Sequence, residues 1–94
     1  MAGFVLVCHD HPNAAELRLA TREAHLAWVA DHRDLVRRAG PILDGRCAMA
    51  GSLFILEAED EDAVRAFHIK DPYARAGLFG RVEILHWRQT VGDP

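Results

Sequence analysis

The chain has 94 residues, of which 50% are hydrophobic and 27% are charged, a composition typical of one folded domain with one core. A net charge of −3 argues against nucleic-acid binding, and no apolar run approaches the roughly 20 residues that a membrane-spanning helix needs. Two cysteines without a CxxC spacing, and no secretory signal at the N-terminus, predict a reduced, cytoplasmic protein. We therefore expect neither nucleic acid nor a membrane as a partner.

The first third of the chain predicts a buried strand, a loop and a long helix. Residues 4–8 form a continuous apolar run with β-branched members, which indicates a strand, and residues 9–13 are typical of a loop. Residues 16–38 are rich in helix-forming side chains and predict one long helix, for which Asn13 is a candidate N-cap. At helical spacing, its buried face is expected to contain Leu17, Ala24, Trp28 and Leu35.

The middle of the chain predicts a hairpin. Gly40 and Pro41 end the long helix, because glycine suits the position after a helix and proline cannot continue one. Residues 41–43 and 52–58 then read as two strands, with the turn signal Asp44-Gly45 in the loop between them.

The last third predicts a second helix and a final strand. The acidic residues 59–62 open the helix at the end that the helix dipole favours for carboxylates. Asp71-Pro72 interrupts it, residues 73–78 favour a short helical turn, and residues 81–88 alternate as a strand. The order β-α-β-β-α-β predicts an α+β, ferredoxin-like fold with both helices on one face of an antiparallel sheet.

The predicted sheet has apolar residues on both faces. Residues 4–8 and 53–56 are apolar throughout, although the predicted helices cover one face only. Small cores are commonly supplemented by oligomerisation, so we expect a second copy of the chain to cover the other face in a homodimer. We expect a single domain over residues 1–94, with a core from about residue 3 to 89 and a short tail.

A polar stripe borders the apolar face of the predicted long helix. Its arginines either pair with carboxylates at the sheet edge or hold an anionic or phenolic ligand. Its central histidine, His25, is either a hydrogen-bonded core residue or a general acid–base group. The stripe consists of Arg18, Arg22, His25, Val29, His32 and Val36.

Two aspartates are candidate partners for His25. Asp10 follows the first strand and Asp71 precedes Pro72, and each is also explained as an ordinary turn residue. Both lie in loops that one end of the sheet can bring close to the helix, and spacing leaves the choice open. The alternating His9 and His11 lack the spacing of a zinc site, so we expect no metal and no dedicated cofactor.

Five segments in order resemble the YCII-related (YciI-like) family, and the likeness extends over about residues 4–88. They are residues 16–26 (ELRLATREAHL), 39–41 (AGP), 51–53 (GSL), 71–73 (DPY) and 76–79 (AGLF). The resemblance implies a dimeric α+β barrel, in which two ferredoxin-like sheets pack face to face. It also implies a pocket with a histidine and an aspartate, proposed as an acid–base pair.

On this resemblance the histidine is His25 and the aspartate is Asp71. Further positions that match the family near the pocket are Arg18, Ser52 and Tyr73, and Asp10 matches the acidic residue after the first strand. The family's Asp-Lys-Pro-Gly turn is here Asp10-His11-Pro12-Asn13, so the basic and glycine positions differ.

Two functions are favoured for such a pocket, ahead of a haem or metal module of the same fold. One is a cofactor-independent lyase, isomerase or dehydrohalogenase acting on a small anionic or aromatic substrate. In it His25 moves a proton, Asp71 orients His25, and Arg18 or Arg22 holds the substrate. The other is a non-catalytic dimer that binds a small molecule, or assists another protein, through the same pocket.

Overall fold

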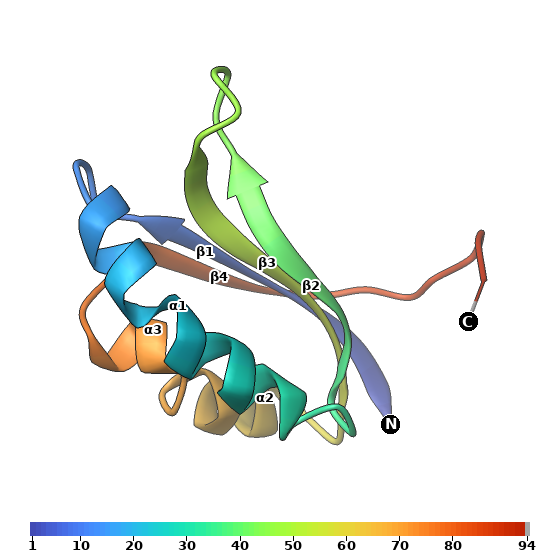
Figure 1. Cartoon of the computed structure of the whole chain (residues 1–94). Helices are drawn as coiled ribbons and strands as arrows, with labels where there is room; N and C mark the ends of the chain where they lie inside the picture. The colour runs from blue at the N-terminus through green and yellow to red at the C-terminus, as the bar shows by residue number, and fades with distance from the viewer. Residues whose placement is uncertain (94) are drawn as a thin grey trace.

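The computed structural model describes residues 1–93, and within them the predicted order of elements is confirmed (Figure 1). The strands form one antiparallel sheet in the order β2-β3-β1-β4, which is the ferredoxin-like arrangement. The elements are β1 (Ala2–Asp10), α1 (Ala15–Ala30), β2 (Val36–Leu43), β3 (Met49–Ala58), α2 (Glu61–His68), α3 (Pro72–Arg75) and β4 (Phe79–His86). No helix among them has the length and apolar character needed to cross a membrane.

All three helices lie on one side of the sheet, and the core lies between the two layers (Figure 1). The two central strands alternate, so every second side chain of β1 and β3 is buried beneath the helices. The short helix α2 adds Val64 and Phe67, and its start is fixed by Asp60, whose side chain accepts the backbone N–H of Ala63. The buried strand residues are Phe4, Leu6, Cys8, Val36, Phe54, Leu56 and Ala58.

The opposite side of the sheet, here called the open face, carries no helix. Val5 pairs with Ile55 and with Leu85, while Val7 pairs with Leu53, so these side chains form one apolar patch across three strands. Leu53 is 37% exposed and Leu85 is 49% exposed.

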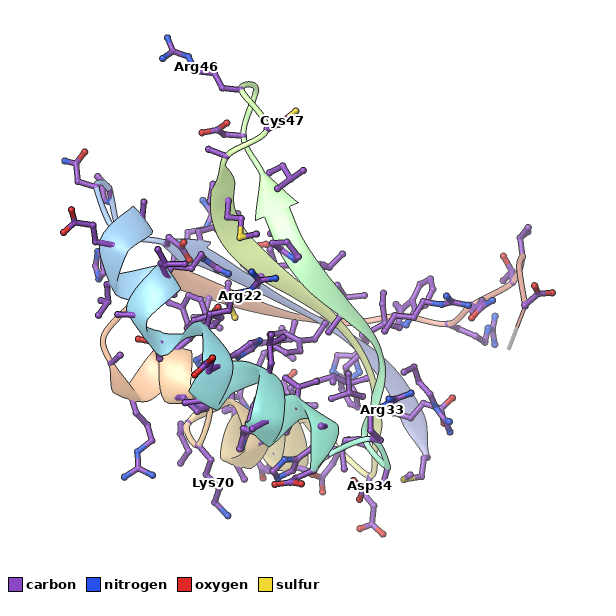
Figure 2. All side chains as sticks on the ribbon, in the orientation of Figure 1. Arg22, Arg33, Asp34, Arg46, Cys47 and Lys70 are labelled. Atoms are coloured by element: carbon purple, nitrogen blue, oxygen red, sulfur yellow. The ribbon has the colours of Figure 1, made fainter. Side chains whose placement is uncertain are left out.

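The predicted long helix is wrong beyond Ala30. Residues 31–35 form turns, and Val36 begins β2, where it pairs with Leu56 and is 4% exposed. Arg37, Arg38 and Ala39 favour helices, but pairing with β3 and burial of Val36 outweigh that propensity. The hairpin strands are therefore longer than predicted, with Arg46 and Cys47 at the tip far from the helices (Figure 2).

The predicted buried face of the long helix is confirmed for Trp28 and Leu35, which pack against the core, and wrong for the other two residues. Leu17 is 37% exposed and Ala24 is exposed, whereas the buried side chains of α1 are Arg18 and His25. The helix therefore turns part of its polar stripe toward the sheet together with Trp28. His32, another member of the stripe, makes a ring-nitrogen hydrogen bond of 2.7 Å to the carbonyl of Trp28.

The start of α1 differs from the prediction as well. Asn13 is not the cap; it lies two residues before the helix in the left-handed region, with φ of 59°, a conformation that asparagine tolerates. Ala14 occupies the N-cap position without a side-chain hydrogen bond. The predicted loop begins later, because β1 continues through His9 and Asp10.

Candidate functional site

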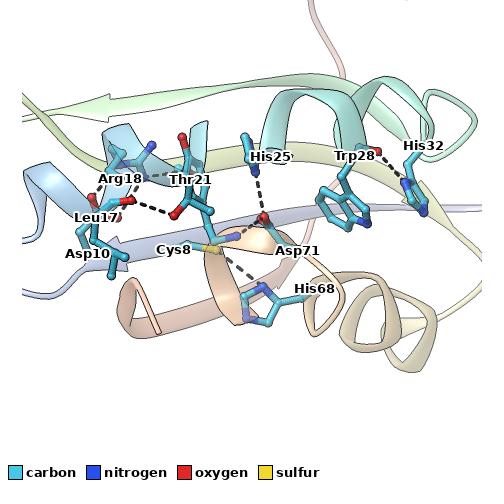
Figure 3. Close-up of polar contacts among 12 residues, drawn as sticks. Cys8, Asp10, Leu17, Arg18, Thr21, His25, Trp28, His32, His68 and Asp71 are labelled. Atoms are coloured by element: carbon cyan, nitrogen blue, oxygen red, sulfur yellow. Dashed lines mark hydrogen bonds and ion pairs between the residues drawn. The ribbon is translucent and has the colours of Figure 1, made fainter. Parts of the chain in front are cut away.

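The structure brings His25 and Asp71 into direct contact between α1 and the start of α3 (Figure 3). Nδ1 of His25 lies 2.8 Å from Oδ1 of Asp71. His25 is 8% exposed and Asp71 is fully buried. Of the two aspartates left open by the sequence, Asp71 is therefore the neighbour of His25.

Asp71 is held in place by the helix that follows it. Its Oδ1 atom also accepts the backbone N–H of Tyr73 at 2.9 Å, so the carboxylate is the N-cap of α3. Pro72 occupies the first helical position, where its missing N–H costs nothing. The Asp-Pro-Tyr sequence thus begins a short helix and fixes a buried carboxylate at the same time. The second oxygen, Oδ2, has no hydrogen-bond partner among residues 1–93.

Tyr73 contacts two side chains of α1, His25 and Arg18. Its ring stacks on His25 with centroids 4.0 Å apart and an interplanar angle of 18°. The guanidinium carbon of Arg18 lies 4.6 Å from the centroid of the same ring, a cation–π contact. Burial raises the pKa of Tyr73, while the charges of Arg18 and Arg22 act in the opposite direction. The phenol is therefore neutral at physiological pH and able to donate a hydrogen bond.

Arg18 is a buried guanidinium that is paired with a carboxylate. Nε and Nη2 donate to the two carboxylate oxygens of Asp10 at 2.7 and 2.9 Å, and Nη2 also donates to the hydroxyl of Ser52 at 2.9 Å. Burial acts against the charge of Arg18, but the hydrogen bond and charge of Asp10 outweigh it and raise the pKa of the guanidinium. The predicted residues Arg18, Asp10 and Ser52 thus lie together, bonded to one another.

Arg22 differs from Arg18 in both its exposure and its pairing. It lies one turn further along α1, is exposed, and makes no ion pair or hydrogen bond within residues 1–93 (Figure 2). Its charge nevertheless acts on Tyr73, which places it in the neighbourhood of the stacked rings.

Two residues behind Asp71 were missed by the sequence interpretation. The sulfur of Cys8, on β1, lies 3.9 Å from Nδ1 of His68, the last residue of α2. Burial, reinforced by the charge of Asp71, raises the pKa of Cys8 to about 12, so the thiol stays protonated at neutral pH. Only the alternation of β1, which turns Cys8 to the side of Phe4 and Leu6, could have indicated that Cys8 faces the helices.

Two hollows among residues 1–93 are not lined by His25. The larger lies at the far end of the sheet, between β1, β2 and the segment after β4, and the smaller is lined by His68, Arg65 and apolar neighbours. Among residues 1–93, no three His, Cys, Asp or Glu side chains are arranged to hold a metal ion.

The fold and the site together define the class of protein. It is a ferredoxin-like α+β protein with a buried histidine–aspartate pair beneath its first helix. The model of the YCII-related domain matches residues 2–88, and the chain belongs to that family. An uncharacterized protein of Haemophilus influenzae is 33% identical over 95 residues, covering 93% of this chain and 97% of the relative. Protein YciI of Escherichia coli O6:H1 is 34% identical over the same share of both chains.

Solved structures agree with this assignment. The 5-chloro-2-hydroxyhydroquinone dehydrochlorinase TftG of Burkholderia phenoliruptrix AC1100, in complex with 2,5-dihydroxybenzoquinone, superposes with a TM-score of 0.87. It is 30% identical, over 94% of this chain and 95% of that protein. An antibiotic biosynthesis monooxygenase, 14% identical with a TM-score of 0.56 over 97% of this chain and 100% of that protein, shares the fold alone.

Proposed function

We propose that the protein is a cofactor-independent acid–base enzyme in which His25 moves a proton and Asp71 orients the imidazole. The observation that carries this proposal is the buried 2.8 Å contact between Nδ1 of His25 and Oδ1 of Asp71. A carboxylate can only accept, so Nδ1 carries the hydrogen and the lone pair of the neutral imidazole is on Nε2.

The accessible edge of the imidazole supports the same role. Nε2 of His25 has no hydrogen-bond partner among residues 1–93, and it is not one of the fully buried polar atoms that lack a partner. It therefore keeps contact with the outside of the chain while the opposite edge of the ring is fixed. A fixed ring with one free basic nitrogen is what proton abstraction from a bound substrate requires.

Arg22 is the residue that we assign to substrate charge. Arg18 is already neutralised by Asp10 through two hydrogen bonds, so it has little capacity left for an anion. Arg22 has no such partner and lies three residues before His25 on the same helix. We therefore divide the two arginines between a structural role for Arg18 and an anion-binding role for Arg22.

The substrate class that we propose is a small hydroxylated aromatic ring. TftG, 30% identical, is a dehydrochlorinase for a chlorinated hydroxyhydroquinone and is known in complex with a dihydroxybenzoquinone. Dehydrochlorination removes one proton and one chloride, so a base and an anion-tolerant site suffice for it.

We further propose that the working form is a homodimer in the cytoplasm. Apolar side chains from three strands make up the open face, and exposed patches of this kind are commonly interfaces. Two unpaired cysteines agree with a reducing compartment. Sedimentation equilibrium at micromolar concentration tests the assembly, and a monomer would contradict it.

The function is tested with 5-chloro-2-hydroxyhydroquinone as substrate and chloride release as the readout. We expect turnover by the native chain, and a loss of about 10²–10⁴-fold in kcat in His25→Ala, the usual effect of removing a general base. The control is His32→Gln, in the turn that follows the same helix and bonded to the carbonyl of Trp28, which should retain activity.

Binding provides the second arm of this experiment. Calorimetric titration with 2,5-dihydroxybenzoquinone should detect one site per chain, weakened by Arg22→Ala. Equal turnover in the native chain and His25→Ala would overturn the catalytic assignment. Binding of the quinone without turnover of this or related chlorinated phenols would instead make the protein the non-catalytic binding dimer.

A further inference from the structure

The residue after β4 continues the open face beyond the sheet. The backbone N–H of Trp87 donates to the carbonyl of Gly3 at 3.1 Å, which extends the pairing of β1 with β4 by one step. Strand alternation puts Trp87 on the same face as Leu85. Gly3 makes room for it, because a Cβ at Gly3 would lie 2.5 Å from the Trp87 carbonyl oxygen and 3.3 Å from its indole ring.

Trp87 is therefore the large end piece of an apolar surface. Trp87 is 37% exposed, and it lies next to Leu85 along β4, beside the row that Leu85, Val5 and Ile55 form across the open face. Tryptophan in such a position is the side chain most often found at the energetic centre of a protein interface.

Residues 88–93, here called the arm, leave the sheet after Trp87 and project away from the body of the molecule (Figure 1). Between the arm and the strands lies a groove of about 1220 Å³. Its wall is basic, with Arg33, Arg37 and Arg38 on the body and Arg88 at the start of the arm. The arm ends at Asp93, whose carboxylate makes no ion pair within residues 1–93.

Only one of the three arginines on the body is neutralised within the chain. Arg37 pairs with Glu57 at 2.6 Å, whereas Arg33 and Arg38 are exposed and have no ion pair among the described residues. The groove and the arm thus carry unpaired charges of opposite sign on one continuous surface.

We propose that two copies of the chain exchange their arms, each arm lying in the groove of the other copy with Trp87 as the anchor and Asp93 beside Arg38. This inference rests on the homodimer of the proposed function and names the segments that hold it together. A two-fold contact brings a surface against itself, so the surface must be self-complementary. A basic groove and an acidic arm tip beside one apolar face meet that requirement, because each copy offers both charges to the other. A partner with only positive or only negative charge would match one of the two and repel the other.

The anchor is tested by sedimentation equilibrium on the native chain, Trp87→Ala, Trp87→Phe and a chain ending at Arg88. We expect the dimer dissociation constant to rise about 30-fold or more in Trp87→Ala, as for a hot-spot residue, and less in Trp87→Phe. Loss of the arm should raise it roughly tenfold. Leu19→Ala, which removes a 73% exposed side chain of α1, is the control and should leave it unchanged.

The exchange itself is tested by reversing charges in separate chains. Asp93→Lys and Arg38→Glu should each weaken self-association, while an equimolar mixture of the two variants should form a heterodimer tighter than either homodimer. This gain should shrink in high salt, because exposed charges are screened. A mixture no tighter than its components would overturn the exchange.

These outcomes separate the inference from the proposed function. An unchanged dissociation constant in Trp87→Ala and in the shortened chain would refute the anchor and the arm while leaving the sheet-to-sheet dimer intact. Chloride release by His25→Ala is a separate measurement, and its result does not bear on the arms. Circular dichroism of each variant confirms that the monomer is folded, so that weaker association is not mistaken for unfolding.

Discussion

One oxygen of Asp71 accepts both Nδ1 of His25 at 2.8 Å and the backbone N–H of Tyr73 at 2.9 Å. The same atom therefore begins α3 and fixes the imidazole on α1. Because Tyr73 also stacks on His25, the short helix and the candidate base are positioned by a single carboxylate. Architecture and site depend on each other here, and substitutions at Asp71 can separate their contributions.

We expect Asp71→Ala to lower the free energy of unfolding by about 2–4 kcal/mol, because it removes a helix cap and leaves a buried ring nitrogen unpaired. Asp71→Asn keeps an oxygen that can accept both hydrogen bonds, and asparagine is a good cap, so the loss should be about 1 kcal/mol. Urea unfolding measures both. Equal losses in the two variants would show that the shared oxygen contributes little.

Substitution by alanine should lower the free energy of unfolding much more at Arg18 than at Arg22, four residues further along α1. Arg18→Ala leaves the nearly buried carboxylate of Asp10 without its partner, and breaking a buried pair costs about 3–5 kcal/mol in free energy of unfolding. Arg22→Ala removes an exposed side chain without a partner, so its cost should stay within about 0.5 kcal/mol.

Ligand affinity should reverse this order between the two arginines. We expect Arg22→Ala to weaken binding of 2,5-dihydroxybenzoquinone several-fold while the melting temperature is unchanged. Arg18→Lys, which retains charge but loses the two-pronged contact with Asp10, serves as the matched control for charge alone. Unchanged affinity in Arg22→Ala would remove this residue from the binding site.

The fold was predictable from the sequence because its strong signals are local. The apolar runs of β1 and β3 and the acidic start of α2 each predict one element, and their order defines the fold. The end of α1 was not predictable, since residues 31–38 favour a helix by composition. Only the pairing of Val36 with Leu56, which depends on the assembled sheet, makes them turn and strand.

The candidate site was predictable in its members but not in its connections. Family resemblance pointed to His25, Asp71 and Arg18, yet 46 residues separate His25 from Asp71, and spacing could not decide between Asp71 and Asp10. The structure divides the two aspartates, giving Asp10 to Arg18 and Asp71 to His25. Cys8 and His68 carried no motif, so only tertiary packing could bring them together.

His68 should make the chain less stable in mild acid. Burial lowers the pKa of His68 below its ordinary value of 6.5, although the charge of Asp71 acts in the opposite direction. As the pH falls below about 6.5, His68 of the unfolded chain becomes protonated before His68 of the folded chain. The free energy of unfolding therefore decreases between pH 6.5 and the lower pKa of the folded chain.

Urea unfolding of the native chain and His68→Gln between pH 7.5 and 5 isolates this effect on stability. The difference in free energy of unfolding should move in favour of His68→Gln as the pH falls, because glutamine does not titrate. The control is His11→Gln, which replaces an exposed histidine in the loop after β1. A difference that stays constant across this range would contradict the lowered pKa.

Cys8 should make the chain less stable in alkali. Burial, with the charges of Asp71 and Asp10, raises the pKa of Cys8 from 9.0 to about 12. Above pH 9 the unfolded thiol loses its proton while the folded thiol keeps it, so stability falls by about 1.4 kcal/mol for each further pH unit.

Both chains compared should carry Cys47→Ser, so that the exposed thiol does not contribute. Cys8→Ala in that background is expected to lose some stability at every pH, since it leaves a small cavity, but to lack the alkaline slope. Guanidinium unfolding at pH 8, 9 and 10 measures the slope, and parallel curves for the two chains would show that the folded thiol ionises as readily as the unfolded one.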